Sequence, residues 1–82
     1  MKGRNIDQEI LLFVLSDEEL GISATDINDI LDKFSNYSHG YVYDRLSVLR
    51  KEGLLAYAEI PRTYLYLTEK GKEVAIKLKE ER

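Results

Sequence analysis

The sequence predicts a small α+β domain that is mostly helical, with a three-helix core, a two-stranded β-hairpin and a C-terminal helix. Apolar residues recur at helical spacing in three segments before Gly53, and they alternate with other residues between Leu54 and Leu67. Helical spacing returns after Thr68. A chain of 82 residues provides for one hydrophobic core, so we expect a single domain over residues 1–82.

Composition restricts the class of protein before any motif is considered. The chain contains no cysteine, which excludes disulfides, zinc–thiolate sites and thiol catalysis. Its longest apolar run, Ile10 to Leu15, is far too short to span a membrane. Acidic residues on both sides of that run argue against a secretory signal. We therefore expect a cytoplasmic protein with no membrane partner.

Charge is distributed unevenly along the chain, whose net charge is −3. Residues 1–40 carry three basic and eight acidic side chains, whereas residues 41–82 carry nine basic and seven acidic ones. The balances of −5 and +2 add to the net charge. A surface that attracts nucleic acid is therefore expected to come mostly from the second half.

The first helix is expected to begin after Asn5, a suitable N-cap, and to run for about ten residues. The acidic segment Asp17–Glu19 is expected to form a loop after it. Apolar residues cover most of the circumference of this helix, so it is either central to the core or shared with a partner subunit. Its helical spacing is carried by Ile6, Ile10, Phe13 and Val14.

The second helix is expected to begin at Ser23, with Asp26 at the third helical position in a pattern like a capping box. A short strand near Ile22 is possible before it. The apolar stripe of this helix consists of Ile27, Ile30, Leu31 and Phe34.

The third helix is expected to begin near Ser38 and to end near Lys51, after which Gly53 supplies a C-cap. Its inner face consists of Val42, Leu46 and Leu49. Two strands of about five residues then flank a tight turn at Ile60-Pro61-Arg62. Thr68 caps a last helix that reaches about Glu80, with Val74, Ala75 and Leu78 on one face.

Two helices joined by a short turn, the second leading into a hairpin, form the plan of a winged helix-turn-helix domain. Three segments of this chain resemble the PadR-like and MarR-like prokaryotic transcriptional regulators. Residues 38–46 (SHGYVYDRL) resemble the recognition helix of these families, residues 49–55 (LRKEGLL) its exit, and residues 66–71 (YLTEKG) the end of the wing. Two features depart from the families, namely a short wing tip with one basic residue and an acidic second helix.

The resemblance implies a sequence-specific regulator of transcription that binds double-stranded DNA. The recognition helix, about 38–51, would lie in the major groove, and the wing would span about 55–67. The residues expected to contact DNA are Tyr37, Ser38, His39, Gly40, Tyr41, Arg45 and Arg62. The third helix also leaves Asp44 and Val48 outside its inner face.

Each of these residues also has a simpler interpretation. Ser38 can be only an N-cap, and Arg62 only a solvated turn residue. Arg45 can pair with Asp44 or Glu52 on a solvated face. The predicted hairpin carries three tyrosines, Tyr57, Tyr64 and Tyr66. They can stack on the bases of single-stranded nucleic acid, or they can only cover one face of the hairpin.

No pattern indicates an enzyme. The chain has one histidine, His39, and lacks the glycine-rich loops that bind phosphate and the motifs of nucleophilic catalysis. The segment from Asp26 to Ile30 begins like a calcium loop but has an apolar residue at its fifth position. We expect no cofactor, no metal and no small-molecule ligand.

We expect a homodimer formed through the first and last helices, because both carry more apolar surface than a small core needs. Such a dimer would space two recognition helices about one turn of DNA apart. The alternative to a DNA-binding regulator is a winged-helix adaptor for protein–protein interaction with weak or no DNA binding. Its acidic second helix would then contact a basic partner, since winged folds serve both uses.

Overall fold

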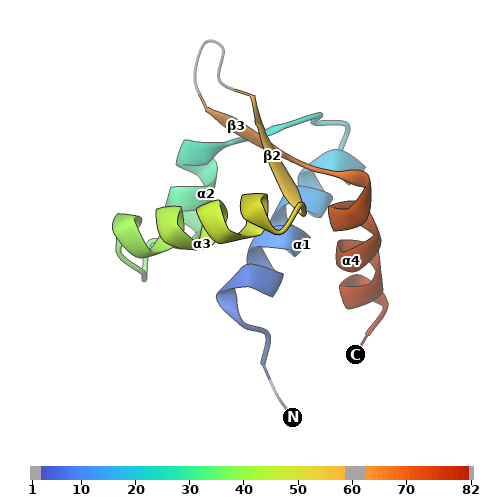
Figure 1. Cartoon of the computed structure of the whole chain (residues 1–82), viewed down its shortest axis with the longest axis horizontal. Coiled ribbons are helices and arrows are strands. Elements are labelled where there is room, and N and C mark those ends of the chain that lie inside the picture. The colour runs from blue at the N-terminus through green and yellow to red at the C-terminus, as the bar shows by residue number, and fades with distance from the viewer. Residues whose placement is uncertain (1–2, 59–62, 82) are drawn as a thin grey trace.

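The computed structural model describes residues 3–58 and 63–81, which form four helices and a three-stranded antiparallel sheet (Figure 1). The elements are α1 (Ile6–Glu19), β1 (Thr25–Asp26), α2 (Ile27–Lys33), α3 (His39–Lys51), β2 (Leu55–Ala58), β3 (Tyr64–Leu67) and α4 (Glu69–Glu80). The prediction of a mostly helical α+β fold is confirmed.

The sheet has the order β1-β3-β2, so the second strand of the hairpin lies in the middle. Leu55 faces Leu67 across the hairpin, and Thr25 faces Leu65 on the other side of β3. Figure 1 shows the hairpin rising above the layer of helices. The strand expected near Ile22 is instead formed by Thr25 and Asp26.

The start of α2 differs from the prediction. Asp26, not Ser23, is the N-cap, and its carboxylate accepts a hydrogen bond of 2.8 Å from the backbone N–H of Asn28. The reason is the pairing of Thr25 and Asp26 with β3, which holds this backbone extended. Thr25 is 1% exposed and its hydroxyl donates to Asp17 Oδ2 over 2.8 Å, which fixes β1 against α1.

The end of α1 also differs from the prediction, because the acidic segment Asp17–Glu19 is helical and not a loop. Acidic residues at a helix C-terminus oppose the helix dipole. Two lysines of α4 offset this repulsion, since the Nζ of Lys72 lies 3.2 Å from Glu18 Oε1 and that of Lys79 lies 2.7 Å from Glu19 Oε2. These partners are distant in sequence, so local patterns gave no sign of the longer helix.

The third helix and its exit agree with the prediction. The Ser38 hydroxyl accepts a hydrogen bond of 3.2 Å from the Tyr41 N–H, and α3 ends at Lys51. Gly53 has a φ of +78°, a backbone conformation that glycine adopts without steric cost. The chain therefore leaves α3 sharply and enters β2.

The entrance to α4 is tied to the exit from α3. The Thr68 N–H donates to the Leu54 carbonyl over 3.2 Å, and the Thr68 hydroxyl donates to the carbonyl of Gly53. That hydroxyl also accepts a hydrogen bond of 3.0 Å from the Gly71 N–H, which makes Thr68 the N-cap. A Cβ on Gly71 would lie 1.9 Å from the Leu54 carbonyl oxygen, so only glycine fits this approach.

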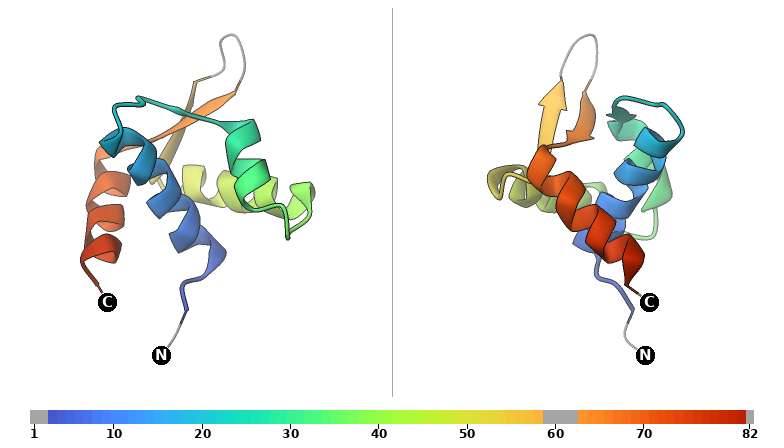
Figure 2. Two further views of the ribbon diagram at one scale, coloured as in Figure 1. Left: turned by 180° about the vertical axis from the view of Figure 1, so that it is seen from behind. Right: turned by 90° about the vertical axis from the view of Figure 1, so that its right-hand side faces the viewer.

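Helices α1 and α4 lie side by side (Figure 2), and their apolar faces are used within one chain. Ala75 is 0% exposed and Leu78 is 8% exposed in the isolated chain, while Val74 is half-buried against the core. The Arg4 guanidinium donates to the Leu78 carbonyl over 3.1 Å, which further joins the two helices. The apolar stripe of α4 therefore packs against α1 within one chain, and the expected homodimer stays a prediction.

Candidate nucleic-acid interface

The first turn of α3 gathers five of the residues that the sequence suggested for contact with DNA. Tyr37, Ser38, His39, Gly40 and Tyr41 are all exposed. The rings of Tyr37 and Tyr41 stack with centroids 5.5 Å apart and an angle of 29° between their planes. The two rings therefore form one aromatic surface beside the start of the helix.

The backbone at this end of α3 is open to a ligand. The first N–H groups of a helix have no carbonyl partner within it, and Ser38 satisfies the one on Tyr41. Apart from its chain neighbours and the backbone of its own helix, no described residue has a heavy atom within 4 Å of a Cβ placed on Gly40. An acceptor can therefore approach the backbone at this point without displacing a side chain.

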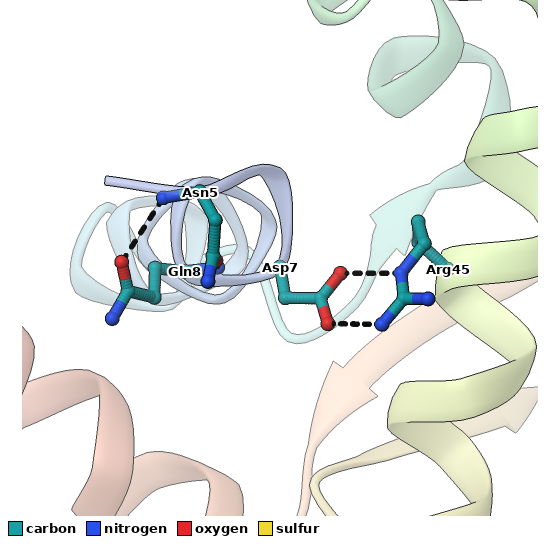
Figure 3. Close-up of polar contacts among 4 residues, drawn as sticks. All are labelled: Asn5, Asp7, Gln8 and Arg45. Atoms are coloured by element: carbon teal, nitrogen blue, oxygen red, sulfur yellow. Dashed lines mark hydrogen bonds and ion pairs between the residues drawn. The ribbon is translucent and has the colours of Figure 1, made fainter. Parts of the chain in front are cut away.

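Arg45 lies in a different setting from the one expected. Its Nε donates to Asp7 Oδ1 over 2.8 Å and its Nη2 to Asp7 Oδ2 over 2.6 Å (Figure 3). The side chains are 29% and 22% exposed, so the pair is half-buried between α1 and α3. Hydrogen bonding to Asp7 raises the pKa of the Arg45 guanidinium above its ordinary value. The suggested partners Asp44 and Glu52 are not the ones that hold the guanidinium.

The first turn of α1 holds Asp7 in place for this contact. The Asn5 carboxamide accepts a hydrogen bond of 2.9 Å from the Gln8 N–H, and the Gln8 carboxamide accepts one of 3.1 Å from the Asn5 N–H (Figure 3). This capping box fixes the helix start from which Asp7 projects. Sequence reasoning missed Asp7, because an acidic residue in a first turn already has a local explanation in the helix dipole.

The outward line of α3 lies opposite its buried residues Val42, Leu46 and Leu49. A spacing of four and seven residues places Gly40, Asp44 and Lys51 along this line. Asp44 and Lys51 are exposed, and neither side chain forms a hydrogen bond or salt bridge within residues 3–58 and 63–81. A ligand that lies along α3 would therefore meet one carboxylate and one ammonium group.

Several basic side chains of the second half of the sequence contact other groups of the same chain. The Arg50 guanidinium lies 4.8 Å from the ring centroid of Tyr57, and the Lys70 Nζ is 3.4 Å from the Glu52 carbonyl oxygen. Lys33 in the first half, and Lys51 and Lys77 in the second, are exposed and form no hydrogen bond or salt bridge with another described residue. Arg62, the basic residue expected at the turn of the hairpin, lies outside the described residues.

The hairpin tyrosines do not form one platform. Tyr57 is the cross-strand partner of the fully buried Leu65, so these two residues share a face of the sheet. Tyr64 and Tyr66 alternate with Leu65 and Leu67 along β3 and therefore point to the other face. A stack of all three tyrosines on consecutive bases is thus contradicted.

Comparisons with family models, with curated protein sequences and with solved structures gave no match to this chain. Within the part of the chain that the structure describes, no helix has the length and apolar character needed to cross a membrane. Over the same residues, no three histidine, aspartate or glutamate side chains are grouped so that they could hold a metal ion.

Proposed function

We propose that this chain is a winged helix-turn-helix domain that binds double-stranded DNA and regulates transcription. The order of elements supports the proposal, because α2 leads through the turn at residues 34–38 into α3, and α3 leads into the β2–β3 hairpin. In this arrangement α3 is the recognition helix and the hairpin is the wing. Strand β1 completes a three-stranded sheet at the base of the wing.

The observation that carries the proposal is the exposed first turn of α3 on a helix whose inner face is buried in the core. The major groove of DNA admits one α-helix, whose N-terminal residues reach the edges of bases. The first turn of α3 lies at the edge of the molecule away from α4 (Figures 1 and 2), while Leu46 and Leu49 anchor the helix in the core. Tyr37 and Tyr41 would contact the DNA backbone or thymine methyl groups, and the free N–H groups would contact phosphate.

Arg45 takes a different part in this proposal from a guanine contact. Its guanidinium is already hydrogen-bonded through two nitrogens to Asp7, so it holds α3 against α1 and positions the recognition helix. Arg62, at the tip of the proposed wing, would contact a phosphate or the minor groove. Lys51 would contact phosphate from the last turn of α3.

The regulator is proposed to act as a homodimer, because a two-fold pair of recognition helices matches two half-sites one turn of DNA apart. With the stripe of α4 filled by α1, the contact would use the outer surfaces of these two helices. Ile76 is 39% exposed on the outer side of α4 and is the apolar residue most available there among those described.

The proposal predicts binding to duplex DNA that weakens with salt. We assume about three phosphate contacts per domain, so the dissociation constant should rise about 40-fold between 50 and 200 mM salt. The measurement is a gel-shift titration of the whole chain against random genomic fragments at both salt concentrations. If only a subset of the fragments is still bound at the higher salt concentration, the chain prefers certain DNA sequences.

The second candidate function, a winged-helix adaptor for a basic protein, is favoured by α2. Its exposed side includes Asp29 and Asp32, which would repel phosphate and attract basic residues. The same titration separates the two functions. If the chain leaves duplex DNA unshifted at both salt concentrations and instead binds a basic polypeptide such as polylysine with salt dependence, the adaptor is the better account.

A further inference from the structure

We propose that Asp44 reads a cytosine in the DNA site, through the amino group that this base presents in the major groove. The inference rests on the proposed function and adds to it one base preference and the residue that determines it. Three observations carry it, namely the place of Asp44 on α3, the chemistry of a free carboxylate, and the engagement of the neighbouring arginine by Asp7.

Asp44 lies where a recognition helix meets base edges. It is exposed on the outward line of α3, one turn after Gly40, and it is the one acidic residue between Lys33 and Glu52. Outside α3 itself and the neighbours of Gly40 in the chain, no described atom lies within 4 Å of the Cβ position at Gly40. The helix can therefore sink into the groove at Gly40, which brings the carboxylate of the next turn toward the bases.

Within residues 3–58 and 63–81, no group donates a hydrogen bond to the carboxylate of Asp44. The adjacent Arg45 would be its natural partner, but both hydrogen-bonding nitrogens on one edge of that guanidinium are occupied by Asp7. Lys51 is two turns further along the helix, about 10 Å away by helical rise. None of the described residues forms a hydrogen bond or salt bridge with the Asp44 side chain.

A free carboxylate discriminates among the four bases because it can only accept hydrogen bonds. In the major groove guanine presents two acceptors, N7 and O6, and thymine presents the acceptor O4, all of which repel it. Adenine offers its N6 amino group but places the acceptor N7 beside it. Cytosine offers its N4 amino group and has no acceptor of its own on the major-groove edge, so it is the base that the carboxylate favours.

The test is selection of binding sites from a random duplex library by the parent chain and by Asp44→Asn. The parent should enrich a site with a fixed C·G pair, and Asp44→Asn should change that pair to A·T, because asparagine bonds adenine through N6 and N7. The flanking positions should stay the same. Asp32→Asn is the matched control, since it makes the same change of charge on the exposed side of α2 and should select the parent site.

A duplex in which that cytosine is replaced by pyrimidin-2-one, which lacks the N4 amino group, isolates the contact. The parent should bind this duplex about tenfold more weakly than the natural site, while Asp44→Ala should bind both equally. Asp44→Asn should also bind random duplexes more tightly than the parent, because a charge that repels phosphate is gone.

The outcomes distinguish this inference from the proposed function. If the parent enriches a site and Asp44→Asn enriches the same base at every position, the inference is wrong and DNA binding stands. If the parent enriches no site at all, the proposed function fails and the inference fails with it. Equal melting temperatures of the parent and both variants exclude unfolding as the cause of any change.

Discussion

Gly71→Ala is expected to lower the free energy of unfolding by about 1–3 kcal/mol, although alanine favours helices over glycine. The added Cβ would lie 1.9 Å from the carbonyl oxygen of Leu54 and 2.8 Å from its carbonyl carbon. These are backbone atoms, so no side-chain rotation relieves the clash. The same carbonyl accepts the Thr68 N–H, so moving it also strains the cap of α4.

Gly40→Ala is the matched control, since it makes the same chemical change inside another helix. The new Cβ meets no atom of the described residues beyond the local backbone of α3, so the helix propensity of alanine should raise the free energy of unfolding by about 0.5–1 kcal/mol. Urea unfolding followed by circular dichroism measures both variants. Equal midpoints for the two variants would contradict the close packing of α4 on the exit from α3.

Leu46→Ala and Leu49→Ala are each expected to lower the free energy of unfolding by about 2–5 kcal/mol. Both side chains are in the core, at 0% and 1% exposed. Truncation loses the transfer free energy of the removed carbons and leaves a cavity beneath α3. For a domain of this size such a loss removes much of the total stability.

Leu20→Ala is the control, because it makes the same substitution at a residue that is 76% exposed. Its effect should stay within about 0.5 kcal/mol, as for most surface substitutions. Thermal melts and urea titrations of all three variants give the measurement. If either core variant matched Leu20→Ala, the inner face of α3 would have been assigned wrongly.

The parts of the fold that follow from local chemistry were predictable from the sequence. Ser38 and Thr68 cap their helices with their own hydroxyl groups, and Gly53 ends α3 through a conformation that glycine adopts freely. The hairpin follows from strict alternation along β3, where Leu65 and Leu67 are buried. In each case the residues that decide the structure lie within a few positions of one another.

The parts that depend on distant partners were not predictable. The N-cap of α2 shifts from Ser23 to Asp26 because β1 pairs with a strand some forty residues later. In the candidate site, His39 and Tyr41 were expected outside the inner face of α3 and are exposed, while their contact with DNA stays a prediction. The partner of Arg45 was not predicted, because Asp7 is 38 positions away and neither residue shows a pattern that links them.

The most direct test of the proposed function is a nuclear magnetic resonance titration of the isotope-labelled chain with a DNA duplex that the chain still binds at 200 mM salt. We expect amide shifts to concentrate in residues 37–41 and at Asp44, while the outer side of α4 around Ile76 stays unchanged at sub-stoichiometric DNA. Shifts that spare the first turn of α3 and concentrate on another element would contradict the assignment of α3 as the helix that contacts DNA.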